Sequence, residues 1–516
     1  MPVPEISHHA FALVPMASMA VMAALTRVGA WSAPRLWRVF QVLSLMGLAA
    51  AGVALIEAGP PMHWVGVLHA TPLGLLLALL VQLLGTVIGA FSSRYLQGEG
   101  NQRHYMGALS AVLASVQLLL VADHWLLLIG VWAMVGAALE QLLCFYRDRP
   151  FALLAAHKKR FADRIADILL LGAAALAWAQ VGSGSLSALW THVQLHGHSL
   201  SLQTSAVLLA LAVMLRTASL PVHGWLIQVM EAPTPVSALL HAGVVNLGGF
   251  VLIRFAPLLQ QASAARAVLL AVGLATAMLA GMVMLTRISI KVRLAWSTVA
   301  QMGFMLVECA LGLYTLAALH LIGHSLYKAH AFLSASSVVR ETRWQDMRPT
   351  LAWSSASLVL APLLSTAMVL SVRYLTGSAS WPWWWSWVLG LAWAPLLWLP
   401  ANGFERSAHL WFGLVAIVGL AAAAMLAHSL PLGLHDFPDP LLGRIALVGM
   451  ATLYVMQALL QRRPRWLAAW RRWSYAGFYL DEAYTRLTLL VWPTRWTPAK
   501  DAGAQPVDLF APGRNS

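Results

Sequence analysis

Long apolar segments, separated by short polar connections, make up most of the 516-residue chain. An α-helix of about 20 apolar residues is long enough to cross a bilayer. We therefore expect an all-α integral membrane protein with about fifteen transmembrane helices. The expected spans begin near His9, Trp37, Thr71, Met106, His124, Asp163, Leu202, Thr234, Ala267, Arg293, Thr315, Ala352, Trp384, Leu410 and Gly443.

Proline interrupts two of the predicted spans. Leu220-Pro221 falls in the seventh span and Ala361-Pro362 in the twelfth. Proline removes a backbone hydrogen bond and so breaks or kinks a helix. Paired broken helices are typical of transporters that are built from inverted repeats, with the working site near the bilayer midplane. We expect two broken helices in such repeats.

The pattern divides the chain into five expected regions. Tyr475 to Trp492 mixes apolar and aromatic residues with charged ones, as interfacial helices do. The regions are N-terminal transmembrane helices (1-122), a core with inverted repeats (123-375), C-terminal transmembrane helices (376-472), an interfacial or docking helix (473-496) and a polar tail (497-516).

Composition and charge agree with a membrane location. Hydrophobic residues make up 60% of the chain and charged residues 10%, with a mean hydropathy of +0.72. The net charge of +14 comes from Lys and Arg in alternate connections, such as Arg147 to Arg164, whereas Gly182 to Ser201 has none. The positive-inside rule explains this better than nucleic-acid binding does. It predicts that the N-terminus lies outside and the C-terminus lies in the cytoplasm.

The cysteines predict neither a disulfide framework nor a metal site. Cys144 and Cys309 both lie within apolar segments, without a CxxC motif. His320 and His324 are spaced like zinc ligands, but no HExxH pattern surrounds them. We expect no metal and no cofactor in this chain.

The strongest polar pattern lies in the eleventh span. His320, His324 and Lys328 recur at positions i, i+4 and i+8. A helix places such residues on one face. Three titratable nitrogens on one face could form a proton wire.

A second group surrounds the first broken helix. It contains Arg216, His223, Glu231 and His241. An arginine holds its proton, so Arg216 could fix a field or an anion, or it could bind carbonyls that the helix break leaves free. His241 can titrate near neutral pH and so could relay protons, although it could instead be a core histidine with satisfied hydrogen bonds.

A third group lies around the fifth and sixth spans. Glu140 lies in the apolar run Val135 to Phe145, where it could exchange protons, or it could pair with Arg147 or Lys158 at the edge of a loop. Arg164 and Asp167 are three residues apart and can pair on one helix face, which favours a structural role.

Four motifs together carry a resemblance to a known family. They are Arg216 to Trp225, Pro233 to His241, Lys291 to Gly303 (KVRLAWSTVAQMG) and His320 to Lys328. The chain resembles the proton-translocating antiporter-type family, which includes the large membrane subunits of respiratory complex I and the Mrp antiporter subunits. The similarity runs from about Trp132 to Arg340, with a weaker match at Phe478 to Tyr484.

The chain departs from the respiratory members of that family. Those members usually have Trp-Glu where this chain has Trp132-Ala133, and a lysine where it has Arg216. The lysine or glutamate expected after the second broken helix is also absent, with Ser371 and Arg373 nearby. With these departures, the chain looks like the membrane subunits of inorganic-carbon accumulation systems.

The resemblance implies a transport subunit rather than an enzyme. The implied partner is a cytoplasmic zinc protein similar to β-carbonic anhydrases, and the joint task is the energised conversion of CO2 to bicarbonate. By carry-over, His241, His320, His324 and Lys328 would form a path for protons or sodium ions. Lys158, Arg164, Asp167, Arg216 and Glu231 would support this path, and Glu140 would replace the missing carboxylate.

Two other functions stay open on the sequence. The chain could be an energy-converting, proton-pumping subunit of a respiratory or hydrogenase complex. It could also be a scaffold that does not conduct and only anchors a soluble enzyme. The substitution at Arg216 and the missing Trp-Glu carboxylate give the scaffold some weight.

Overall fold

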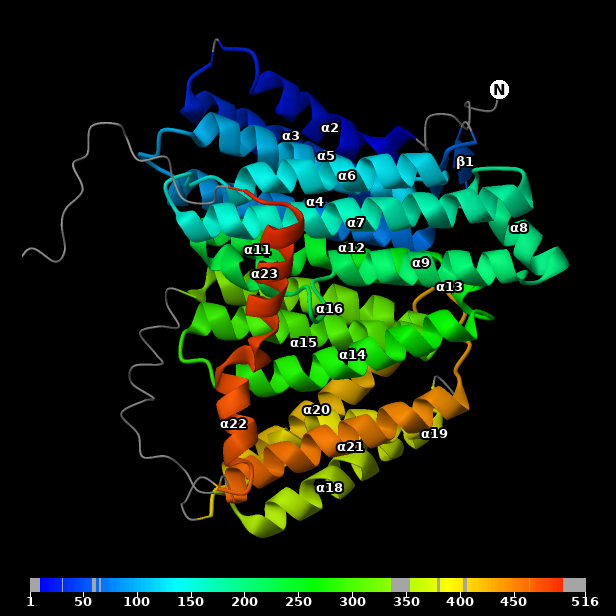
Figure 1. Cartoon of the computed structure of the whole chain (residues 1–516), viewed down its shortest axis with the longest axis vertical. Helices are drawn as coiled ribbons and strands as arrows, with labels where there is room; N and C mark the ends of the chain where they lie inside the picture. Colours follow the sequence, from blue (N-terminus) through cyan, green and yellow to red (C-terminus); the bar gives the residue numbers. More distant parts are fainter. Residues whose placement is uncertain are drawn as a thin grey trace, which may run out of the picture.

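Long α-helices run side by side through most of the protein (Figure 1). A computed structural model of the chain describes residues 10–29, 31–57, 62–64, 66–335, 353–377, 381–401, 406–463 and 465–494. Within these residues the one sheet is a short antiparallel hairpin, and the rest consists of helices and the connections between them. The predicted all-α membrane architecture is thus confirmed in outline. The predicted polar tail (497-516) lies outside the described residues.

The N-terminal helices pack as neighbours around buried side chains. Their bounds are η1 (Ala10–Leu13), α2 (Val14–Leu25), α3 (Ala33–Ile56), β1 (Met62–Trp64), β2 (Leu68–Ala70), α4 (Pro72–Tyr95), α5 (Gln102–Val121) and α6 (Trp125–Leu143). The Thr71 hydroxyl accepts a hydrogen bond from the Gly74 amide and so caps α4 at its start. Phe40 packs against Gly89, where an added Cβ would lie 2.0 Å from the Phe40 ring. A small residue there lets α3 and α4 approach each other closely.

The middle of the chain forms the centre of the bundle. Its elements are α7 (Pro150–Val181), α8 (Leu186–His196), α9 (Leu200–Arg216), α10 (Gly224–Gln228), η2 (Val229–Glu231), α11 (Thr234–Ala242), η3 (Val244–Asn246), α12 (Leu247–Arg254), α13 (Ala256–Leu259), α14 (Ser263–Met284), α15 (Ile290–Ala310) and α16 (Tyr314–Leu333). The segment Thr234–Arg254 is the most enclosed of the candidate spans, with 94% of its apolar window buried. It therefore forms the axis around which the other helices pack.

The last part of the chain adds a lipid-facing layer and two crossing helices. Its elements are α18 (Ser355–Leu375), α19 (Trp383–Trp393), η4 (Ala394–Leu397), α20 (Arg406–His428), α21 (Pro440–Arg462), α22 (Ala468–Tyr475), η5 (Gly477–Tyr479) and α23 (Leu480–Val491). Large apolar side chains on α20, such as Trp411 and Phe412, are exposed, as expected for contact with lipid. Figure 1 shows α22 and α23 lying across the long helices, and α23 packs against α7 and α10.

The predicted count of fifteen spans is not confirmed. Within the described part of the chain, ten helices are long and apolar enough to cross a membrane, and two shorter apolar helices cover Ala10–Leu25 and Leu200–Arg216. The protein is therefore a multi-pass membrane protein. The five predicted regions and the inverted repeats stay predictions.

The helix interruptions differ from those expected. At the first position, α9 ends at Arg216 and helical structure resumes at Gly224. At the second position the expectation of a break is wrong, because α18 continues through Pro362. A proline costs a helix one hydrogen bond, and packing against α19 and α20 holds this helix together. The structure has an interruption that was not expected, at η3 between α11 and α12.

Candidate functional site

Three titratable side chains lie along α16, as their spacing predicts. The rings of His320 and His324 lie 6.1 Å apart between their centres. His324 and Lys328 are buried, and His320 is partly buried. Eight residues of helix separate His320 from Lys328, which corresponds to about 12 Å along the helix axis. The stripe therefore covers less than half of the hydrocarbon core, which is about 30 Å thick.

A carboxylate that the sequence analysis did not select completes one end of this stripe. Glu308 in α15 is 3% exposed and bonds to His320, with 2.7 Å between Oε2 and Nδ1. A carboxylate surrounded by Leu306, Val307 and Cys309 is costly in an apolar helix unless it is paired. That apolar surrounding was the signal in the sequence that could have found it.

Lys328 lies at the other end of the stripe and is completely buried. Its Nζ donates to the carbonyl oxygen of Leu294 at 2.9 Å and to the hydroxyl of Ser297 at 2.7 Å. Both acceptors are uncharged, and no carboxylate pairs with Lys328 in the described part of the chain. A buried ammonium group without a counter-ion is costly, so Lys328 is suited to gain and lose a proton.

His241 lies in the last turn of α11, immediately before the helix interruption. It is completely buried, and its ring stacks on Phe332 of α16 with 4.5 Å between ring centres. It is close enough to Lys328 for an electrostatic interaction. The ring nitrogens of His241 and His324 have no hydrogen-bond partner among the described residues. Such atoms are uncommon inside proteins, and an imidazole nitrogen can bind or release a proton.

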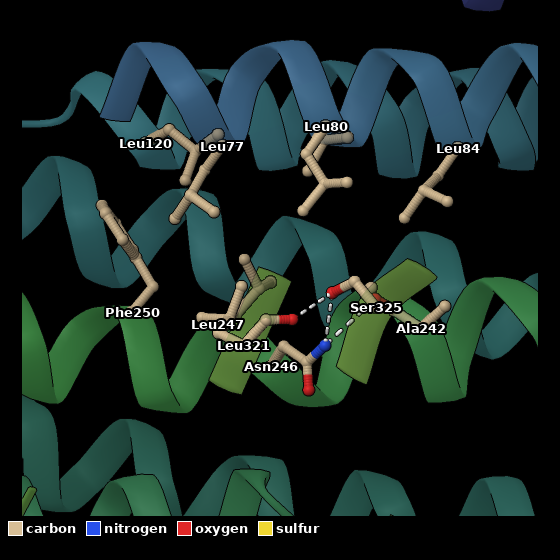
Figure 2. Close-up of a pocket in the computed structure, with 12 residues that line it drawn as sticks. Leu77, Leu80, Leu84, Leu120, Ala242, Asn246, Leu247, Phe250, Leu321 and Ser325 are labelled. Carbon is tan, nitrogen blue, oxygen red and sulfur yellow. Dashed lines mark hydrogen bonds between the residues drawn. The ribbon is translucent and has the colours of Figure 1, made fainter. Parts of the chain in front are cut away.

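A small cavity lies beside the helix interruption (Figure 2). Its volume is about 20 Å³, and leucines of α4 form one wall. On the other side, Asn246 of η3 donates through Nδ2 to the hydroxyl of Ser325 at 2.8 Å and to the carbonyl of Ala242 at 3.0 Å. These bonds use the carbonyl that the interruption leaves free, and they tie η3 to α16.

Ion pairs lie along the neighbouring helix α7. Lys159 pairs with Asp163, and Lys158 pairs with Asp481 of α23. Asp167 binds two arginines, Arg164 at 3.0 Å on the exposed side and the buried Arg216 of α9.

Arg216 also makes an aromatic contact. Its guanidinium carbon lies 4.6 Å from the centre of the Trp132 ring. The carboxylate and the ring together hold the guanidinium at the end of α9.

Two predicted site residues lie away from the histidines. Glu140 pairs with Arg160, and both side chains are partly exposed. Its partner is therefore Arg160, and not Arg147 or Lys158, which the alternative of a paired carboxylate had named. Glu231 is 3.8 Å from Arg149, and both are exposed. The structure thus places Glu140 and Glu231 in surface ion pairs, and it brings together His241, His320, His324 and Lys328.

The described side chains do not form a metal site. No group of three His, Cys, Asp or Glu side chains in the described ranges could hold a metal ion. The titratable nitrogens along α16 can bind and release protons, and a row of ion pairs lies beside them on α7.

Known proteins resemble this chain over most of its length. The family described as "NADH:quinone oxidoreductase/Mrp antiporter, TM" matches residues 122–389. The probable inorganic carbon transporter subunit DabB of Hydrogenovibrio crunogenus is 38% identical over 483 residues, which is 89% of this chain and 90% of that protein. NADH-quinone oxidoreductase subunit L of Mycobacterium tuberculosis is 32% identical over 54% of this chain and 45% of its own length.

A solved structure has the same fold. It is that of the Mrp complex from Dietzia sp., with a TM-score of 0.59 and 21% sequence identity, and the match covers 94% of this chain and 55% of that one. The relatives are transporter and antiporter subunits, which supports a cation-conducting membrane subunit. The chain belongs to the membrane-subunit family of NADH:quinone oxidoreductases and Mrp antiporters and, within it, to the DabB inorganic carbon transporter subunits.

Proposed function

We propose that this chain conducts protons through the inner membrane and thereby drives a cytoplasmic, DabA-like zinc protein that captures CO2 as bicarbonate. The observation that carries the proposal is the stripe of Glu308, His320, His324 and Lys328, with His241 beside it. Ionisable groups in a membrane-spanning bundle are costly and usually mark an ion route.

The order of the groups suggests the route. Glu308 and His320 share a hydrogen bond at one end, and His324 follows one turn along α16. His241 and Lys328 interact electrostatically at the next turn. Protons would pass along this row, since each group can accept and release one.

The chemistry of the row favours protons over sodium ions. His241, His320, His324 and Lys328 offer nitrogen atoms, whereas hard cations are bound in proteins by several oxygen atoms. Imidazole exchanges protons near neutral pH.

The ion pairs of α7 supply a means of coupling to a partner. Lys158 of α7 pairs with Asp481 of α23. Helix α7 also carries Asp163 and Asp167, which form ion pairs of their own. The many Lys and Arg residues before α22 favour a cytoplasmic position for this end of the chain. A partner that binds there would act on α7 through α23.

Two observations weigh against the alternatives. The inorganic carbon transporter relative from Hydrogenovibrio crunogenus covers 89% of this chain, whereas the NADH-quinone oxidoreductase relative covers 54%, which favours carbon uptake over a respiratory pump. A scaffold has no use for the buried, unpartnered nitrogens of His241 and His324.

Purification of the tagged chain from its native membrane in mild detergent tests the proposal. The expected result is a stoichiometric soluble partner that contains zinc. Recovery with iron–sulfur or flavin subunits would instead support a redox-driven pump. His241→Ala separates a conductor from a scaffold, because a conductor would still assemble with its partner but lose carbon uptake.

A further inference from the structure

The connection between α20 and α21 covers the start of α16. The Phe437 amide donates to the carbonyl of Gly312 at 2.8 Å, and the Asp439 amide donates to that of Leu311 at 3.1 Å. Gly312 has a φ of +75°, and an added Cβ would lie 2.1 Å from the Phe437 carbonyl oxygen. Glycine is therefore needed at this position for the connection to approach so closely.

This connection brings a carboxylate to the helix that carries the histidines. Asp436 accepts a hydrogen bond from the Thr315 amide through Oδ1 at 2.8 Å. Its other oxygen, Oδ2, is buried and has no hydrogen-bond partner among the described residues. Burial raises the pKa of the Asp436 carboxyl above its usual range, and the hydrogen bond from Thr315 opposes this effect.

A second unpartnered oxygen belongs to Tyr314, the first residue of α16. Tyr314 is completely buried, and its hydroxyl has no hydrogen-bond partner in the described part of the molecule. Tyr314 interacts electrostatically with Asp436 and with Cys309, which adjoins Glu308. Buried polar oxygens without partners are costly. Two of them at the end of the proposed proton route suggest that they take part in proton transfer.

The geometry of the helix hairpin places Glu308 at this same end. Helix α15 ends at Ala310 and α16 begins at Tyr314, so Glu308 and Asp436 both lie near the turn between them. Thr315 precedes His320 by five residues, which is about 7.5 Å along the axis of α16.

We propose that Asp436 is the proton-loading group of this route, and that it passes protons by way of the Tyr314 hydroxyl to Glu308 and His320. This inference rests on the proposed function. In each step one O–H bond breaks and another O–H or N–H bond forms, and no electrons are transferred. Asp436 returns to the carboxylate and takes the next proton from the aqueous side.

Three other charged or titratable side chains lie near Asp436, namely Arg266, His428 and Asp439. Arg266 of α14 donates to the carbonyl of Ala310 at 2.8 Å and lies 3.7 Å from Asp439. His428 of α20 interacts electrostatically with Asp436. Asp439 caps α21 by accepting from the amides of Leu441 and Leu442. Asp439 is therefore a matched control, because it is a carboxylate of the same connection whose structural task is known.

Proton flux into liposomes tests the inference with Asp436→Asn and Asp439→Asn in the full chain, purified with its partner. Asparagine keeps the oxygen that accepts from Thr315, so the variant should fold and assemble like the parent. We expect Asp436→Asn to slow the flux by about 10²-fold, the usual contribution of a positioned acid or base, and Asp439→Asn to leave it unchanged. Asp436→Glu should restore part of the flux.

Two results would overturn the inference. One is a flux in Asp436→Asn equal to that of the parent while His320→Ala abolishes it. In that case the proposed function stands and the loading group is elsewhere. The other is an equal loss in Asp439→Asn, which would indicate a structural effect of the connection. If His320→Ala and Lys328→Ala also conduct normally, the proposed function itself fails.

Discussion

Lys158 of α7 donates a hydrogen bond to Asp481 of α23, although 323 residues separate them in the sequence. Gln228 of α10 donates to the other oxygen of Asp481 at 3.3 Å. Gly224 leaves the room for this contact, since an added Cβ would lie 1.4 Å from the Asp481 Oδ1. The Tyr484 hydroxyl donates to the Lys158 carbonyl at 2.7 Å. The crossing helix is thus bound to a buried charge of the transmembrane bundle.

Asp481→Asn should weaken the docking of α23. The substitution leaves the buried Lys158 without its counter-charge, which costs about 1–3 kcal/mol, the usual range for a buried polar group that loses its partner. Faster proteolytic cleavage between α22 and α23 would report the loss. Glu482→Gln is the control, because Glu482 is exposed, and it should be cleaved like the parent. Equal cleavage rates in all three proteins would contradict the assigned role of the pair.

Arg216→Ala should impair proton flux, whereas Arg164→Ala should not. Both arginines bind Asp167, but Arg216 is buried and Arg164 is half exposed. Removal of Arg216 leaves Asp167 with only the exposed pair to Arg164, which contributes little, whereas removal of Arg164 leaves the buried pair in place. Flux measurements on the two variants, at matched protein levels in the membrane, check this. A larger loss in Arg164→Ala would reverse the assignment.

The sequence alone predicted the helical membrane architecture and the polar face of α16. Apolar segments of bilayer length predict membrane-spanning helices. A spacing of i, i+4 and i+8 places the three residues on one face of such a helix. It failed at Pro362, because a proline shows that a hydrogen bond is lost but not whether the neighbouring helices hold the segment straight. The interruption at η3 contains no proline and could not be found in that way.

Ion-pair partners were the least predictable part of the site. The sequence placed Lys158 and Asp481 in different regions, and only the fold brings them together. Glu140 has the neighbours of a buried carboxylate along the chain but lies at the partly exposed edge of α6, beside Arg160. Which face of a helix is buried depends on its packing neighbours, and these are not encoded in the local sequence.

Glu308→Gln should slow proton flux while the protein still folds. Glutamine can keep a hydrogen bond to His320 but carries no charge and cannot take up a proton. The expected loss is about 10²-fold, as for other positioned proton-transfer groups. Glu308→Asp keeps the charge and should retain more flux than Glu308→Gln. The opposite order would mean that the size of the side chain, and not its proton, matters.

Gly303→Ala should destabilise the bundle by about 1–3 kcal/mol, the usual cost of overpacking. An added Cβ there would lie 2.6 Å from the Ala277 amide nitrogen and 2.8 Å from the Gly273 carbonyl oxygen, and backbone atoms cannot move aside easily. Gly281→Ala in α14 is the control, because no atom lies within 4 Å of its added Cβ. Thermal unfolding in detergent should separate the two variants. A normal melting temperature for Gly303→Ala would contradict the close packing of α14 and α15.

The central claim is that protons pass along α16, and Lys328→Arg tests it most directly. Arginine keeps the positive charge and can donate to Leu294 and Ser297, but it does not release its proton. Proton flux should be measured in liposomes that contain the full chain with its partner. We predict a variant that assembles normally and conducts at background level. Flux at the level of the parent would show that Lys328 does not exchange protons, and would contradict the account.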